Sequence, residues 1–139
     1  MKTEKVSLNL SPCELGQIDC LVEKGLFDSR SDFLRTAARK FLDGYESELQ
    51  NFLQPEHLKG ESAANFYFAG VASFGKAEAE NFIAKKIRVH IRGFGLLSIS
   101  NKVTPEEISQ TVQSCKVYGK ILAGQEILDE LKKISDNAN

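Results

Sequence analysis

An alternating segment near the start of the chain most constrains the fold. Residues 5–10 (KVSLNL) alternate polar and apolar side chains with the period of a half-buried strand. One strand cannot make a sheet alone, because its backbone groups need partners and its apolar side, Val6, Leu8 and Leu10, needs cover. The same strand of a second copy, paired antiparallel about a two-fold axis, supplies both. The sequence therefore predicts a homodimer joined by a two-stranded ribbon.

Two capped helices are predicted directly after this strand. Ser11 and Glu14 form a capping box around Pro12, and the first helix extends to about Lys24, where Gly25 ends it. Ser29 caps a second helix over residues 30–43, and its apolar face fits a close helix–helix contact. The predicted dimer core consists of Val6, Leu8, Leu10, Phe33, Ala37 and Phe41.

The polar side of the ribbon is the candidate functional surface. A two-stranded ribbon fits the DNA major groove, and Lys5, Ser7 and Asn9 carry groups that can bond to base edges. The start of the second helix, residues 29–31 (Ser29, Arg30 and Ser31), offers free backbone N–H groups and a helix dipole to a phosphate. We expect the first set to read bases and the second to bind the DNA backbone.

These elements in this order resemble a known family. Strand, short helix, Gly turn and a second helix opening Ser29-Arg30-Ser31-Asp32 and continuing to Leu42 are similar to ribbon-helix-helix DNA-binding proteins, the relatives of the Arc and MetJ repressors and of CopG-type regulators. The resemblance covers about residues 3–43. It implies an obligate dimer that reads a double-stranded operator with its ribbon. We therefore expect a cytoplasmic transcription regulator that acts as a repressor.

The rest of the chain predicts a second domain of mixed α+β class. Residues 44–62 are acidic and read as a partly helical linker, and residues 63–135 as a folded domain. Strands at 66–72, 87–92, 96–99 and 115–122 alternate with helices in the order β-α-β-β-α-β, with a final helix, and a hairpin turns at residues 93–95. That is the order of a ferredoxin-like sheet. A weak duplication of a strand–Gly–strand–helix unit, with short strands stacking, is the alternative.

Composition narrows the functional classes. The chain has 18 basic and 19 acidic residues, so its net charge of −1 favours no partner. It has no phosphate loop, nucleophile motif, zinc pair or long apolar run, and we expect no enzyme activity, cofactor or membrane span. Nickel-responsive members of the resembled family use several His and a Cys, whereas only His57 and His90 occur here, so no metal site is expected. The three cysteines are expected to be reduced thiols.

Two further possibilities concern the second domain. Arg88, His90 and Arg92 alternate along one predicted strand and would form a cationic strip for an anionic ligand or for extra DNA phosphate. The domain itself is expected either to assemble dimers into tetramers or higher oligomers, or to sense an effector. An antitoxin or plasmid-maintenance adaptor, whose C-terminal half binds a protein partner, is the alternative to a repressor.

Overall fold

The computed structural model describes residues 3–55 and 63–137. These residues form two compact units, and the chain passes from one to the other between Leu49 and Gln50. The boundary lies within the segment that the sequence analysis assigns to the linker, of which residues 56–62, including His57, are outside the described residues. Within the described ranges no helix is long and apolar enough to cross a bilayer.

The N-terminal unit contains the two predicted helices. Helix α1 spans Pro12–Glu23 behind the Ser11–Glu14 capping box, and α2 spans Arg30–Asp43 behind its Ser29 cap. Gly25, with φ of +79°, makes the turn between them, a conformation that glycine adopts without strain. Residues 3–10 form neither helix nor strand in the single chain. A short helix, α3, follows at Glu46–Leu53.

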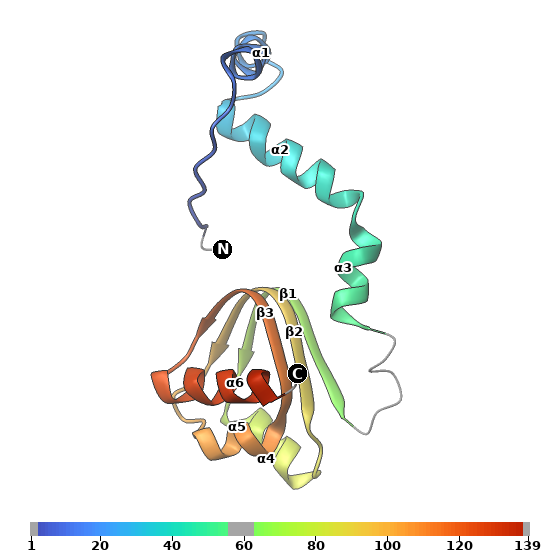
Figure 1. Ribbon diagram of the computed structural model, residues 1–139, viewed down its shortest axis with the longest axis vertical. Helices are drawn as coiled ribbons and strands as arrows, with labels where there is room; N and C mark the ends of the chain where they lie inside the picture. The colour runs from blue at the N-terminus through green and yellow to red at the C-terminus, as the bar shows by residue number, and fades with distance from the viewer. Residues whose placement is uncertain (1–2, 56–62, 138–139) are drawn as a thin grey trace. The chain divides into compact units, whose positions relative to one another are not determined.

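The C-terminal unit is a sheet of three parallel strands in the order β1-β2-β3. The strands span Ala64–Phe74 (β1), Val89–Ile99 (β2) and Val112–Leu122 (β3). Each strand is followed by a helix, namely α4 (Lys76–Ala84), α5 (Pro105–Thr111) and α6 (Gln125–Asn137). All three helices lie on one side of the sheet (Figure 1). The mixed α+β class that the sequence predicts is confirmed.

One strand of the sheet replaces two that the sequence predicts, at 87–92 and 96–99. The predicted hairpin at residues 93–95 is wrong: β2 runs unbroken from Val89 to Ile99 and pairs in parallel on both sides. The sheet is therefore not ferredoxin-like, because that arrangement contains antiparallel pairs. The alternative of a repeated strand–Gly–strand–helix unit matches the observed order. Its strands join into one sheet, however, rather than stacking separately.

A glycine in each strand explains how the three repeats align. Gly70, Gly95 and Gly119 lie in register across the sheet and have φ values of +118°, +122° and +137°. A Cβ on Gly95 would lie 2.1 Å from the carbonyl oxygen of Gly70, and one on Gly119 would lie 2.0 Å from that of Gly95. The backbone conformation therefore favours glycine at all three positions, and the close approach of the preceding strand requires it at Gly95 and Gly119.

The core lies between the sheet and its three helices. The side chains of β2 that face the helices, such as Ile91 and Leu97, are fully buried and belong to one apolar cluster with Ile108 of α5 and Leu131 of α6. On β1 and β3 most residues that face the helices are only partly buried, and only Phe74 and Val112, at strand ends, are fully buried. Burial is thus complete along the central strand and incomplete along most of both edge strands.

A charged contact joins two of these helices. The Glu107 carboxylate caps α5 by accepting from the Thr104 amide, 3.0 Å away, and also accepts from the Lys76 ammonium of α4 at 2.5 Å. The bond from Lys76 is the main reason that the pKa of Glu107 lies below its ordinary value of 4.5. Its ionised form is therefore favoured by folding.

The glycine register gives a first prediction. We expect Gly95→Ala to destabilise the C-terminal unit by more than the roughly 1–3 kcal/mol of a strained backbone position, because the methyl group also meets the Gly70 carbonyl. Gly124→Ala is the control, since it has open space and no positive φ and should cost under about 1 kcal/mol. Urea unfolding of both variants measures the difference, and equal losses would contradict the proposed cause.

The Glu107 contact gives a second prediction. We expect Glu107→Gln to lower the unfolding free energy at neutral pH, because folding favours the carboxylate. The difference from the parent should shrink as the pH falls below 4.5 and vanish once Glu107 is protonated in the folded parent too. Glu106→Gln, at an exposed residue of the same helical turn, is the control. Denaturant unfolding across this pH range tests it, and a pH-independent difference would contradict the electrostatic origin.

Candidate nucleic-acid interface

The polar residues of the predicted ribbon are all accessible. Lys5, Ser7 and Asn9 are exposed and alternate with Val6 and Leu8. The two apolar side chains are also exposed in the single chain, at 85% for Val6 and 61% for Leu8. Only Leu10, next to the first helix, is partly buried. One copy of the chain therefore leaves the apolar side of this segment in water.

An apolar groove in the same unit lies beside the end of this segment. It has a volume of roughly 610 Å³ and is open to solvent. Its walls come from α1, from the start of α2 and from the end of the alternating segment, and are formed by Leu10, Glu14, Gln17, Ile18, Cys20, Leu21, Phe33 and Leu34. Leu10 and Phe33 belong to the predicted dimer core, whereas the other wall residues do not. Helical spacing in the sequence marks Ile18 and Leu21 among them, because these two residues lie on the apolar face of α1.

The remaining predicted core residues lie along α2. Phe33 is partly buried and meets the Phe27 ring edge-on, with 4.9 Å between ring centroids. Ala37 is exposed, and Phe41 is 72% exposed and contacts the Tyr45 ring. The outer end of α2 is therefore also an uncovered apolar surface. Tyr45 is not among the predicted core residues; it lies in the turn between α2 and α3, and its ring contacts that of Phe41, four residues earlier.

The start of α2 offers a small set of donors. The Ser29 hydroxyl accepts from the Asp32 amide, 3.0 Å away, which completes the cap. Within the described part of the chain, the amides of Arg30 and Ser31 donate to no other group. These two amides and the helix dipole together favour an anion at this end.

Arg30 is already engaged within its own unit. Its Nε and Nη2 atoms donate to the two carboxylate oxygens of Asp19, at 2.7 and 2.8 Å, and this bidentate contact ties α2 to α1. The Arg30 hydrogen bond lowers the pKa of Asp19, and Asp19 raises the pKa of Arg30. Both side chains are about half exposed, so the pair adds little stability. Its effect is to fix the guanidinium at the start of α2.

Arg88, His90 and Arg92 are not brought into one exposed strip. Arg88 donates to the Ser109 carbonyl of α5. His90 is buried, and its Nδ1 lies 2.6 Å from the Ser114 hydroxyl. Arg92 instead contacts Phe52. Strand alternation predicts a shared face, but Arg88 precedes β2 and remains exposed, His90 is buried beside β3, and Arg92 lies against Phe52 of α3.

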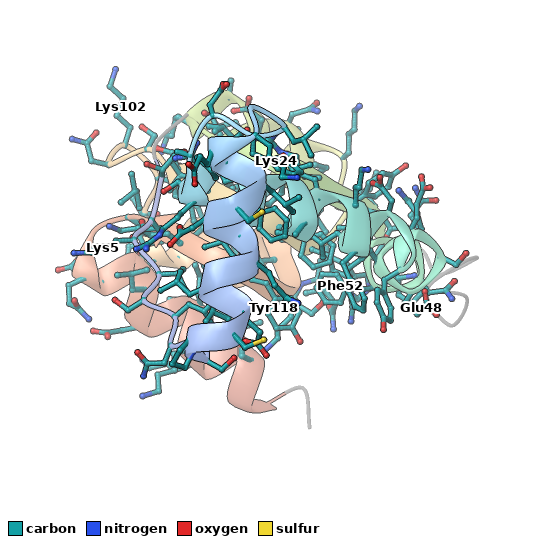
Figure 2. All side chains as sticks on the ribbon, turned by 90° about the horizontal axis from the view of Figure 1, so that it is seen from above. Lys5, Lys24, Glu48, Phe52, Lys102 and Tyr118 are labelled. Atoms are coloured by element: carbon teal, nitrogen blue, oxygen red, sulfur yellow. The ribbon has the colours of Figure 1, made fainter. Side chains whose placement is uncertain are left out.

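Phe52, near the end of α3, organises the uncovered face of the sheet. The Arg92 guanidinium lies over its ring, 4.9 Å from the centroid, and donates to the Phe52 carbonyl at 2.9 Å. The same ring contacts Phe94 and Tyr118, at 5.0 and 5.1 Å between centroids. Phe52 and Tyr118 are labelled in Figure 2. Sequence reasoning missed this cluster, because its members are far apart along the chain and no local period connects them.

The cysteines and acidic residues do not assemble a further site. All three cysteines are free thiols, and burial raises the pKa of Cys115 to about 11, so this thiol stays protonated at neutral pH. Across residues 3–55 and 63–137, no three His, Cys, Asp or Glu side chains gather as metal ligands would. The candidate DNA-binding groups are therefore the accessible polar groups of the N-terminal unit.

Comparison with known proteins shows the family of the chain. A family model described as the ribbon-helix-helix transcriptional regulator family matches residues 1–128, which is most of the chain. The match extends beyond the N-terminal unit and includes all three strands of the sheet. Neither the curated proteins nor the solved structures contain a match. The resemblance that rested on residues 3–43 is confirmed and now covers both units.

Proposed function

Because the chain belongs to the ribbon-helix-helix transcriptional regulator family, whose members bind DNA, we propose that it is a repressor that reads its operator with a ribbon formed by two copies. The observation that carries this proposal is the exposure of Val6 and Leu8 in the single chain. Two large apolar side chains in water on one side of an alternating segment need a partner strand. A second copy of residues 5–10 supplies it.

The dimer follows from the same alternation. Antiparallel pairing of residues 5–10 places the apolar side against the helices of both copies and covers the groove beside Leu10 and Phe33. The exposed apolar surface formed by Phe41 of α2 and by Tyr45, in the turn after α2, then meets the partner's helices. Lys5, Ser7 and Asn9 are left on the opposite side of the ribbon, where they face the major groove.

Lys5, Ser7 and Asn9 each have a different role in recognising bases. Asn9 can bond adenine through two contacts, Lys5 donates to guanine, and Ser7 takes either role. At the start of α2, the amides of Arg30 and Ser31 and the Ser29 cap hold a backbone phosphate, and Asp19 positions the Arg30 guanidinium beside it. Phosphate contacts set the register, and base contacts set the sequence preference.

The C-terminal unit acts in assembly. Residues 63–137 contain a folded sheet with its own core, which supports a regulator over an antitoxin whose tail folds only on a partner. Repression at repeated sites then benefits from joining dimers, because linked dimers bind neighbouring half-sites at a high effective concentration.

A third prediction tests the dimer. We expect Leu8→Asp to abolish operator binding, because pairing would bury two uncompensated carboxylates. The helices α1 and α2 should also lose hydrogen-exchange protection, since they fold on the dimer. Leu8→Ile is the matched control and should keep both properties. Gel shifts with a duplex selected from a random library by the parent protein, together with exchange mass spectrometry, measure the effect. Binding by Leu8→Asp at parental affinity would refute the ribbon.

A fourth prediction separates base reading from phosphate binding. We expect Asn9→Ala to cost about 1–3 kcal/mol on the selected duplex and to relax base preference at one position. Arg30→Ala should weaken all duplexes alike and reduce the slope of log affinity against log salt by about one unit per lost phosphate contact. Gel shifts at several salt concentrations measure both effects, with circular dichroism as the folding control.

Two results would contradict this division between base reading and phosphate binding. Selection of the same duplex by a folded Lys5→Ala, Ser7→Ala, Asn9→Ala triple variant would show that the ribbon does not read the bases. A change in base preference with Arg30→Ala would assign that residue to recognition instead of to phosphate binding.

A further inference from the structure

The first strand of the sheet lacks the features that protect an edge. β1 lies at one side of the sheet, and its sequence ANFYFAGVASF contains no charged residue and no proline over 11 residues. Natural edge strands are usually short, or carry lysine, proline or a bulge, because their free backbone groups otherwise pair with another chain. β1 is paired with β2 over its whole length, so its outer side presents a regular row of such groups.

The opposite edge of the sheet is different. β3 carries Lys116 and Lys120, both exposed, on the side of the sheet that faces away from the helices. Its pairing with β2 also includes an irregularity between Val89 and His90. β3 therefore has the charges that discourage edge pairing, and β1 does not.

The side chains of β1 also lack cover. Tyr67 and Val71, which point away from the helices, are 48% and 60% exposed. On the helix side, Phe66 and Phe68 are only partly buried, whereas their neighbour Ile91 on β2 is fully buried. Another strand beside β1 would cover side chains on both faces of β1, in the way that β1 and β3 cover those of the central strand.

Gly70 leaves the middle of this edge open. The Cβ directions of Gly95 and Gly119 point within the sheet at the carbonyl of the preceding strand. Gly70 is in register with them and has the same sign of φ, so its Cβ direction points outward from the free edge of β1. No described atom lies within 4 Å of that position. A side chain there would block a neighbouring strand, and glycine does not.

We propose that β1 pairs antiparallel with β1 of a second copy, about a two-fold axis close to Gly70, and joins the two sheets into one. The proposal gives a surface to the assembly role proposed above for the C-terminal unit, and rests on that role. Symmetric pairing buries the uncharged edge of both copies and leaves the lysine-bearing β3 strands as the new outer edges. Pairing of β1 with β3 of another copy would instead bring the lysine-bearing edge against β1, and would leave one β1 edge open in any assembly that does not close into a ring.

The test removes the other contact between copies. In a full-length Leu8→Asp background the ribbon no longer joins two chains, so any remaining dimer must form elsewhere. We expect this variant to sediment as a dimer. Adding Val71→Lys should raise the dissociation constant at least about tenfold, because it places two like charges near the two-fold axis. Leu122→Lys makes the same kind of change on β3, at another exposed apolar residue, and should leave the dimer intact.

Hydrogen exchange on the otherwise unchanged chain gives a second measurement that does not depend on the Leu8 variant. Amides in residues 64–74 should be protected throughout the parent strand, and about half of them should become exchangeable in Val71→Lys. Residues 112–122 should exchange alike in both proteins. A monomeric Leu8→Asp variant, a Leu8→Asp, Val71→Lys variant that stays dimeric, or β1 amides in the parent that exchange as freely as those of β3 would each overturn the proposal.

The two proposals fail in different ways. If β1 pairing is lost while operator binding is intact, the repressor proposal stands, but β1 is not the surface through which the protein assembles. Loss of base selection with β1 protection intact would leave two paired sheets without an assigned DNA function.

Discussion

A β-strand needs hydrogen-bonding partners, and this constraint governs both units of the chain. In the N-terminal unit, residues 5–10 have a strand pattern but form no strand in a single copy, and Val6 and Leu8 remain exposed. In the C-terminal unit, β1 forms a strand because β2 pairs with it, yet its other edge carries no protecting charge. In each case the chain provides half of a structure that a second copy would complete.

The arrangement separates recognition from the stable part of the molecule. The N-terminal unit has one buried apolar side chain within its two main helices, Ile18, so a partner would have to supply most of its stabilising burial. The C-terminal unit has a continuous core around Ile91, Leu97 and Ile108. If the N-terminal unit is stabilised by pairing and the C-terminal unit folds by itself, DNA affinity would depend on the assembly state of the protein.

The sheet is held by close backbone approach as much as by its core. Gly70, Gly95 and Gly119 repeat at one register position, and each later glycine accommodates the carbonyl of the strand before it. Phe52 then contacts the face of the sheet without helices, where the Arg92 guanidinium stacks on its ring. The α3 helix that carries Phe52 also contains the junction between the two units, at Leu49 and Gln50. Any change at this aromatic cluster therefore acts directly on the connecting helix.

The sequence by itself determined the local elements of this protein. Caps at Ser11, Ser29 and Thr104 fixed where helices begin, because a side-chain acceptor for free amides is a property of adjacent residues. Only the tertiary structure decided how the strands meet. Alternation in residues 87–99 defines two faces but not a neighbour, and a glycine with positive φ suits a hairpin turn as well as a bent strand, so Gly95 was read as a turn. The cluster around Phe52 was equally hidden, because contacts between residues 40 or more positions apart leave no local pattern.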